Sequence, residues 1–206
     1  MQIRYATNLS AEQYVRQKAW HAATLNECPL HPRGGCAFRK NGTYQRKYPA
    51  GTKIARWYCA VGHMSFSLLP DCLASRLSGS LIKIEDVLTE VENSHSQEAA
   101  AENIRIDIIL PSALRWIRRR IFLVKASLSM LIELLPGLFA VCHPSILSFQ
   151  SALNVDYALP ELRQVASSYL PVLPPPLGFG PRPKTKKFKK SHFQHKTGTD
   201  PPNIRC

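Results

Sequence analysis

The segment from Cys28 to Pro70 contains no aspartate and no glutamate. Over the whole chain, 27 lysines and arginines outnumber 14 acidic residues and give a formal net charge of +13. The basic residues within the acid-free segment are Arg33, Arg39, Lys40, Arg46, Lys47, Lys53 and Arg56. Because no nearby carboxylate in the sequence neutralises them, they attract polyanions through counterion release. This composition predicts nucleic acid as the partner.

Catalytic motifs are also lacking, because the chain has no Gly-rich phosphate loop and no nucleophile motif. After Asp107 the acidic residues are Glu133, Asp156, Glu161 and Asp200, in short segments interrupted by proline. A nuclease of the carboxylate type needs three acidic side chains on one sheet to hold two metal ions. The sequence therefore predicts a protein that is not an enzyme.

The chain has neither a disulfide framework nor an export signal. Its six cysteines are irregularly spaced, and Met1 to Ser10 has no apolar core of the kind that a signal peptide needs. We expect a reducing, cytoplasmic setting, in which thiolates remain available as metal ligands.

Two short groups of metal ligands flank the basic segment, Cys28-Pro-Leu-His31 and Cys59-Ala-Val-Gly-His63. Structural zinc takes four sulfur or nitrogen ligands in a tetrahedron, and a pair spaced by two or three residues can bind from one tight turn. The spacing predicts Zn²⁺ held by Cys28, His31, Cys59 and His63.

Two other cysteines compete as ligands. Cys36 follows Gly34 and Gly35, which allow the loop to approach the other ligands, and Cys72 is a weaker competitor that we interpret as a packing thiol. Between and after the ligand pairs, residues 37–44, 53–58 and 64–69 are rich in strand formers. They predict a β-meander around the metal.

This segment resembles the zinc-ribbon heads of bacterial insertion-sequence transposases and related transposon-associated proteins. The resemblance rests on Arg39-Lys40-Asn41-Gly42-Thr43-Tyr44, on Tyr58-Cys59 and on the strand Met64-Ser65-Phe66-Ser67-Leu68-Leu69-Pro70. It implies a DNA-recognition head without a catalytic body, acting as a homodimer or with a transposition-complex partner. The chain departs from the family pattern by placing histidine where the second cysteine of each knuckle usually stands.

The fold class predicted from these patterns is α+β, a small zinc ribbon followed by helices and a disordered basic tail. The expected division is an N-terminal helix within 1–27, the ribbon at 28–71, a helix-turn-helix-like region at 78–125, an apolar helical region at 126–170 and a proline-rich tail at 171–206.

Within the helix-turn-helix-like region, the helix that begins after Pro111-Ser112 directs Arg115, Arg118 and Arg119 outward, towards phosphates or guanine edges. A solvated arginine face is the alternative. Residues 104–110 alternate as a strand does and lengthen the preceding turn, which is unlike a true helix-turn-helix. In the tail, Lys186 and Lys187 are further candidates for contact with nucleic acid.

Two alternative functions stay open on the sequence. A ribonucleoprotein component would use the same basic surfaces to bind RNA instead of DNA. A membrane-attached protein would use residues 121–141 as its anchor, since this apolar stretch approaches the length of a bilayer span. Because Lys125, Glu133 and Pro136-Gly137 interrupt the stretch, we expect a buried helix there and no membrane partner.

Overall fold

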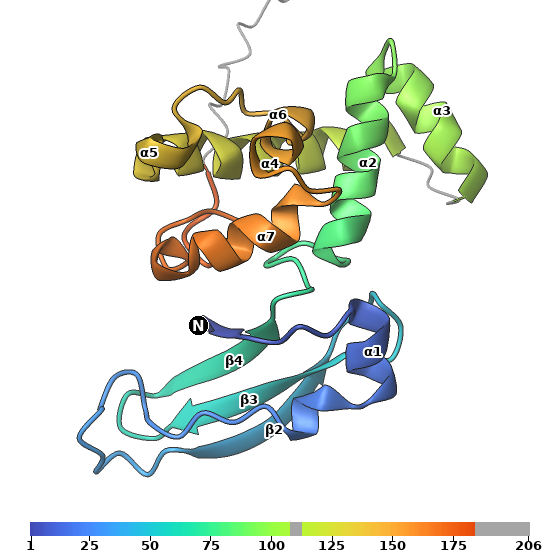
Figure 1. The fold of residues 1–206 in the computed structure, drawn as a ribbon. Coiled ribbons are helices and arrows are strands. Elements are labelled where there is room, and N and C mark those ends of the chain that lie inside the picture. The colour runs from blue at the N-terminus through green and yellow to red at the C-terminus, as the bar shows by residue number, and fades with distance from the viewer. Residues whose placement is uncertain (108–112, 184–206) are drawn as a thin grey trace, which may run out of the picture.

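The computed structural model describes residues 1–107 and 113–183. A four-stranded sheet forms one part of the molecule, and a layer of helices packs above it (Figure 1). The predicted α+β class is confirmed.

The sheet has the order β1-β4-β3-β2, with strands at Gln2–Tyr5 (β1), Arg39–Gln45 (β2), Lys53–Cys59 (β3) and Met64–Pro70 (β4). The last three form the predicted antiparallel meander. The first strand was not predicted, because Gln2–Tyr5 is short and pairs in parallel with β4, more than sixty residues away.

The N-terminal helix is shorter than the sequence suggested. Ser10 caps helix α1 (Ala11–Arg16) through a capping box with Gln13. The helix ends at Arg16, since Lys18 takes a left-handed conformation and a short 3₁₀ turn, η1 (Ala19–His21), follows.

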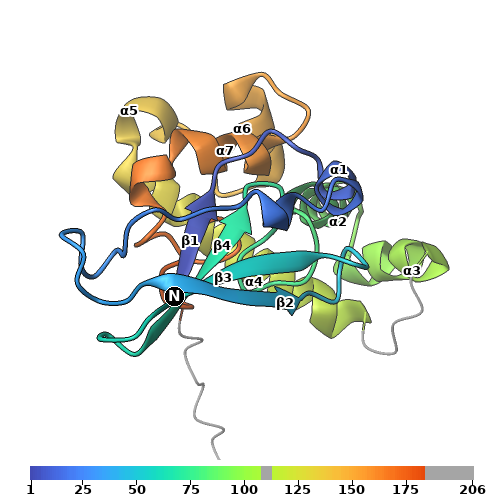
Figure 2. The same cartoon turned by 90° about the horizontal axis from the view of Figure 1, so that it is seen from below.

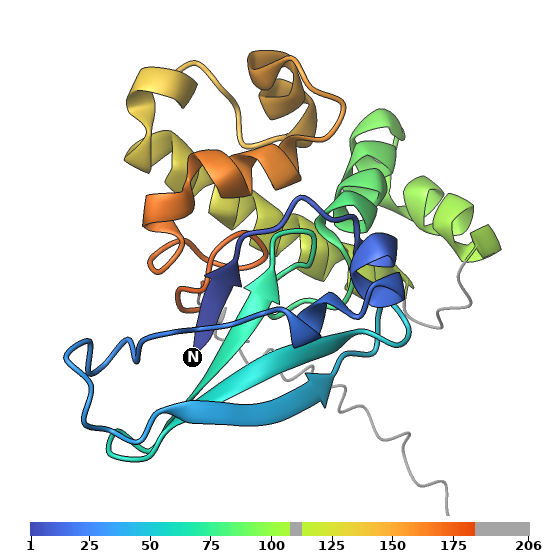
Figure 3. The ribbon, with the colours of Figure 1, turned by 60° about the horizontal axis from the view of Figure 1, so that its bottom comes forward.

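One face of the sheet is covered by this N-terminal segment, which runs across the strands (Figure 3). Tyr14, Trp20 and Ala23 pack there against Ala55 and Leu68. The next segment, which carries residues 28–36, lies at one end of the sheet, beside the turn between β3 and β4 (Figure 3).

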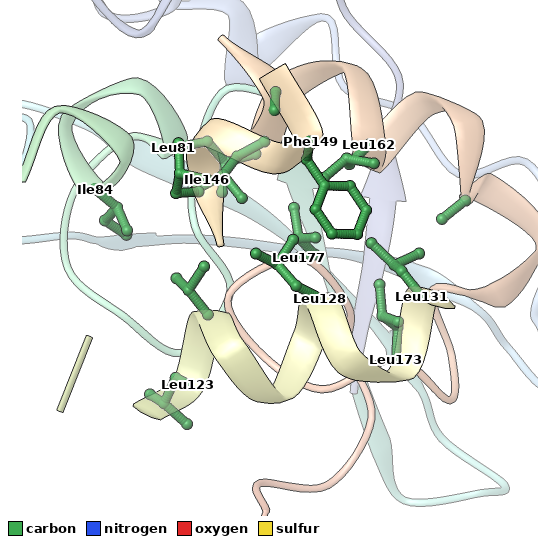
Figure 4. Packing of buried hydrophobic residues seen from close by; sticks show 14 of the residues in the cluster. Leu81, Ile84, Leu123, Leu128, Leu131, Ile146, Phe149, Leu162, Leu173 and Leu177 are labelled. Carbon is green, nitrogen blue, oxygen red and sulfur yellow. The ribbon is translucent and has the colours of Figure 1, made fainter. Parts of the chain in front are cut away.

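The helical region contains α2 (Leu81–Asn93), α3 (Gln97–Asp107), α4 (Ala113–Leu134), α5 (Pro136–Phe139), α6 (Ile146–Leu153), α7 (Ala158–Val165) and the 3₁₀ turn η2 (Ser167–Tyr169). Helix α3 lies at the outer edge of this region, as the views from the side and from below show (Figure 1 and Figure 2). Leu123, Leu128 and Leu131 of α4 meet Phe149 and Leu162 in its core (Figure 4).

The apolar stretch 121–141 is divided between α4 and α5, and Val124 and Phe139 bury their side chains in this core. No helix in the described part of the chain has the length and apolar character needed to cross a bilayer. Of the strand-like residues 104–110, those up to Asp107 belong to α3, and the remaining three lie outside the described residues.

Residues 171–180 belong to the folded core, although the sequence placed the start of the tail at 171. Leu173 and Leu177 are fully buried among the helices (Figure 4). Ser127 donates from its Oγ to the carbonyl oxygens of Pro174 (2.9 Å) and Pro175 (3.0 Å). The prolines lack N–H donors, so only their carbonyls need partners when buried, which is why a proline-rich segment can pack here.

Arg163 joins the helical region to the sheet. Its side chain is fully buried and donates to the carbonyl oxygens of Asp71 (3.1 Å) and Leu177 (3.0 Å). Asp71 in turn forms an ion pair with Arg4 of β1 at 2.8 Å. These contacts connect the helical region to the end of the sheet.

Candidate metal centre

The first ligand loop is built by two successive tight turns. The backbone N–H of His31 donates to the carbonyl of Cys28 (3.0 Å), and the N–H of Gly34 donates to the carbonyl of His31 (2.9 Å). Gly34 and Gly35 both have φ near +80°, a conformation that glycine adopts without strain. This double reversal returns Cys36 to the same side as Cys28.

The second part of the site comes from the end of β3. Cys36 is held beside that strand end, because the N–H of Ala60 donates to its carbonyl oxygen (3.3 Å). The N–H of Gly62 donates to the sulfur of Cys59 (3.1 Å). A Cβ at Gly62 would lie 2.6 Å from Leu30 Cδ1, so a larger residue there would make the exposed Leu30 side chain move.

Four side chains converge between these loops: Cys28, His31, Cys36 and Cys59, with their ligand atoms all within 4.8 Å of one another. His31 Nδ1 lies 3.7 Å from the sulfur of Cys28 and 3.4 Å from that of Cys59. Tetrahedral zinc with ligands at about 2.0 to 2.3 Å places neighbouring donor atoms about 3.5 to 3.8 Å apart. The group therefore has the chemistry and the spacing to hold a metal ion.

The thiols favour a cation electrostatically. Burial acts to raise the pKa of Cys28, but hydrogen bonds from the His31 side chain and from the N–H groups of Leu30 and His31 lower it to about 6. Burial, followed by the neighbouring thiols of Cys28 and Cys59, raises the pKa of Cys36 to about 11. Adjacent thiolates repel one another, and a divalent metal ion removes this conflict by stabilising all three.

The structure brings together three of the four predicted ligands, and the fourth is the competitor Cys36. His63 lies outside the group, at an exposed turn with φ of 46°, and its Nδ1 is 3.4 Å from the hydroxyl of Tyr58. The Gly34-Gly35 pair was the sequence signal for Cys36. Cys72 packs elsewhere, between the sheet and the helices, where burial raises its pKa to about 12.

The predicted basic residues of the sheet have different surroundings. Arg39, Lys47 and Lys53 are exposed, and Arg56 is half-buried. Lys40 is exposed and donates to the carbonyl of His21 (3.3 Å).

Arg46 has a structural role, because it donates to the carbonyl oxygens of Ala74 (2.9 Å) and Leu77.

On α4, the side chains of Arg115, Arg118 and Arg119, which were predicted to contact nucleic acid, are exposed. Arg118 forms an ion pair with Glu98 at 3.3 Å. The next residue, Arg120, turns inward and stacks on Trp116, with 3.3 Å from its Cζ to the ring centroid. Lys186 and Lys187 lie outside the described residues.

Fold and site together define an α+β protein with a buried Cys₃His group that can hold a metal ion. Comparison of the chain with protein-family models, with curated proteins and with solved structures gave no match.

Proposed function

We propose that this chain is a zinc-dependent nucleic-acid-binding protein with DNA as its partner. The proposal rests on the Cys₃His group at the end of the sheet. The sequence around this group, from Cys28 to Pro70, contains basic residues and no acidic residue. The resemblance to transposase heads implies that this binding serves a transposon-associated role.

Zinc is the metal that suits this donor set. Three sulfurs and one imidazole nitrogen are soft ligands, and a closed four-ligand site is typical of structural zinc. When bound, the ion supplies cross-linking and folding free energy, since it joins the loop of Cys28 and Cys36 to Cys59 at the end of β3. The exposed arginines and lysines of the sheet then contact phosphates, and those of α4 contact a groove.

Metal analysis tests the site directly. We expect about one zinc per chain in protein purified without a histidine tag. Cys36→Ser and Cys59→Ser should lose the metal, whereas His63→Ala should retain it. A folded wild type that contains no zinc would contradict the proposal, as would a metal content that Cys36→Ser leaves unchanged.

Binding is tested next, with zinc-loaded protein and labelled duplex DNA, single-stranded DNA and structured RNA in a salt titration. Log affinity for DNA should fall linearly with log salt concentration, because phosphate contacts release counterions. Tighter binding to structured RNA than to either form of DNA would show that the partner is RNA and not DNA. The absence of binding to all three would refute the proposed function.

A further inference from the structure

The two faces of the sheet differ in how they are covered. In the register of the strands, Arg39 is the partner of Tyr58, and Tyr58 is the partner of Ser65. Directly paired residues share a face, so these three side chains form one row across the sheet. Arg56, Ser67 and Gln2 form the next row on the same face. Trp57, Ala55 and Leu68 point to the opposite face, beneath the N-terminal segment.

The face of the sheet that carries Arg56 and Tyr58 is covered by other residues only at the end away from the metal centre. Ile54 and Leu69 are fully buried there against Leu73 and Phe179. Further towards the metal centre the side chains become accessible: Arg56, Tyr58, Ser65 and Ser67 are half-buried, and Arg39 is exposed. This leaves a polar strip of sheet with one aromatic ring and two arginines, which we name the open sheet face.

The arginines of the open sheet face are not neutralised. Among the described residues, neither Arg39 nor Arg56 forms a salt bridge or side-chain hydrogen bond, and Arg56 Nε is buried without a partner. One more arginine adds positive charge near the strip. Met1 accepts from the N–H of Ser67 (2.9 Å), and burial, followed by the charge of Arg76, lowers the pKa of its N-terminal amine.

Tyr58 is held in place beside these charges. Its hydroxyl lies 3.4 Å from Nδ1 of His63, the histidine that the metal group does not use. A flat aromatic ring on a sheet, flanked by cations and by serine hydroxyls, matches an unpaired base that stacks while its phosphates meet arginine. In a duplex the base faces are already stacked on one another, so no base face is accessible to the ring of Tyr58.

We infer that the open sheet face binds a single-stranded segment of nucleic acid, with a base stacked on Tyr58 and phosphates held by Arg39 and Arg56. The hydroxyls of Ser65 and Ser67 lie in the same strip and offer hydrogen bonds to base edges. The inference rests on the proposed function and specifies the surface and the form of nucleic acid.

The test measures fluorescence anisotropy of a labelled pyrimidine oligonucleotide about 12 nucleotides long, in DNA and RNA versions, with the full zinc-loaded chain. Tyr58→Phe keeps the stacking ring and should bind like wild type. Tyr58→Leu should weaken binding to either oligonucleotide about tenfold, because it removes the stacking. Tyr157→Leu, at an exposed tyrosine of the helical region, is the matched control and should have no effect.

The arginine contacts are tested by salt dependence. Arg56→Gln should reduce the slope of log affinity against log salt by about 0.7, the value for one phosphate contact on a single strand. Arg16→Gln, at an exposed arginine of α1, should leave the slope unchanged.

The outcomes separate the two levels of the proposal. Tighter binding to duplex DNA, with Tyr58→Leu and Arg56→Gln unchanged and Arg119→Gln weakened, would overturn the open sheet face and leave the proposed function standing. Equal losses of affinity in Tyr58→Phe and Tyr58→Leu would show that a base does not stack on the Tyr58 ring. A chain that binds no nucleic acid at all would overturn both.

Discussion

At the scale of single residues, Arg163 shows how a buried cation can be satisfied without an acidic partner. Among the described contacts, its guanidinium donates only to carbonyl oxygens, those of Pro70, Asp71, Leu73, Pro176 and Leu177. Burial lowers its pKa to about 10, so the group stays protonated near neutral pH. The planar fork of arginine carries five N–H donors on three nitrogens and so reaches acceptors that are spread apart, whereas the three donors of an ammonium group radiate from one nitrogen.

Replacing this fork should be costly. Arg163→Lys should lower the free energy of unfolding by about 3 kcal/mol, because buried carbonyls lose their donors. Urea denaturation monitored by circular dichroism measures the change. Arg182→Lys, at an exposed arginine, is the control and should stay within about 0.5 kcal/mol of wild type. Equal effects of the two substitutions would show that Arg163 does not anchor the junction.

Gly178 is required by a close backbone approach. A Cβ at this position would lie 2.0 Å from the carbonyl oxygen of Leu173, so the buried chain would have to move. Gly178→Ala should destabilise the fold by about 3 kcal/mol. Gly137→Ala is the control, since a Cβ there meets no atom within 4 Å, and in helix α5 it should be neutral or stabilising by up to about 1 kcal/mol. Thermal denaturation of both variants distinguishes the two cases.

At this scale, the sequence predicted three of the four side chains that converge at the metal centre. Cys28, His31 and Cys59 lie in short-range pairs or at a strand end, where local spacing is informative. Cys36 was recognised as a competitor only, because its approach depends on two glycines with positive φ. The position of His63 depends on the turn between β3 and β4, which the C-x-x-x-H spacing does not specify.

At the scale of elements, helix α2 provides caps for two later helices. Glu85 accepts hydrogen bonds from the N–H groups of Ala158 (2.6 Å) and Leu159 (2.8 Å) at the start of α7. Glu92 similarly accepts from the N–H groups of residues 146 and 147 at the start of α6. A carboxylate at a helix N-terminus satisfies free N–H groups and interacts favourably with the helix dipole.

The two caps should differ in strength. Helix α7 has no side-chain cap of its own, whereas α6 also has Ser145, and Glu85 is the more buried of the two glutamates. We expect Glu85→Ala to cost about 3 kcal/mol and Glu92→Ala about 1 kcal/mol of unfolding free energy. Chemical denaturation of the pair measures the difference. A larger effect at Glu92 would contradict this ranking.

The elements themselves were largely predictable, but their partners were not. Leu81, Ile84 and Leu88 have the spacing of one helix face and mark α2, and Ser10 followed by Gln13 has the capping-box spacing that marks the start of α1. Glu85 lies outside the apolar stripe of its helix, where a carboxylate is expected to face water, but its side chain is fully buried. The two N–H groups that it caps, those of Ala158 and Leu159, lie more than seventy residues away, so no local pattern could identify the cap.

At the scale of the whole molecule, the metal centre and the helical core are separate clusters. Phe66 packs with Cys28, Cys36 and Cys59, and none of these residues belongs to the core formed by α2, α4, α6 and α7. Metal removal should therefore act first on the loop of residues 28–36 and on the turn between β3 and β4.

Amide hydrogen exchange can test this separation. After chelation of the metal, exchange in residues 28–36 should accelerate at least about tenfold, while the central part of α4 stays protected. Simultaneous loss of protection in α4 would show instead that the sheet and the helices unfold as one unit.

The burial of residues 171–180 also has a consequence for synthesis of the chain. Leu173 and Leu177 complete the helical core, and Phe179 covers Ile54 and Leu69 of the sheet. During translation these apolar surfaces stay open to water until the segment has left the ribosome, although the helices that it covers precede it in the chain. Chaperones that bind exposed apolar surface therefore have their opportunity on this protein before residues 173–179 emerge.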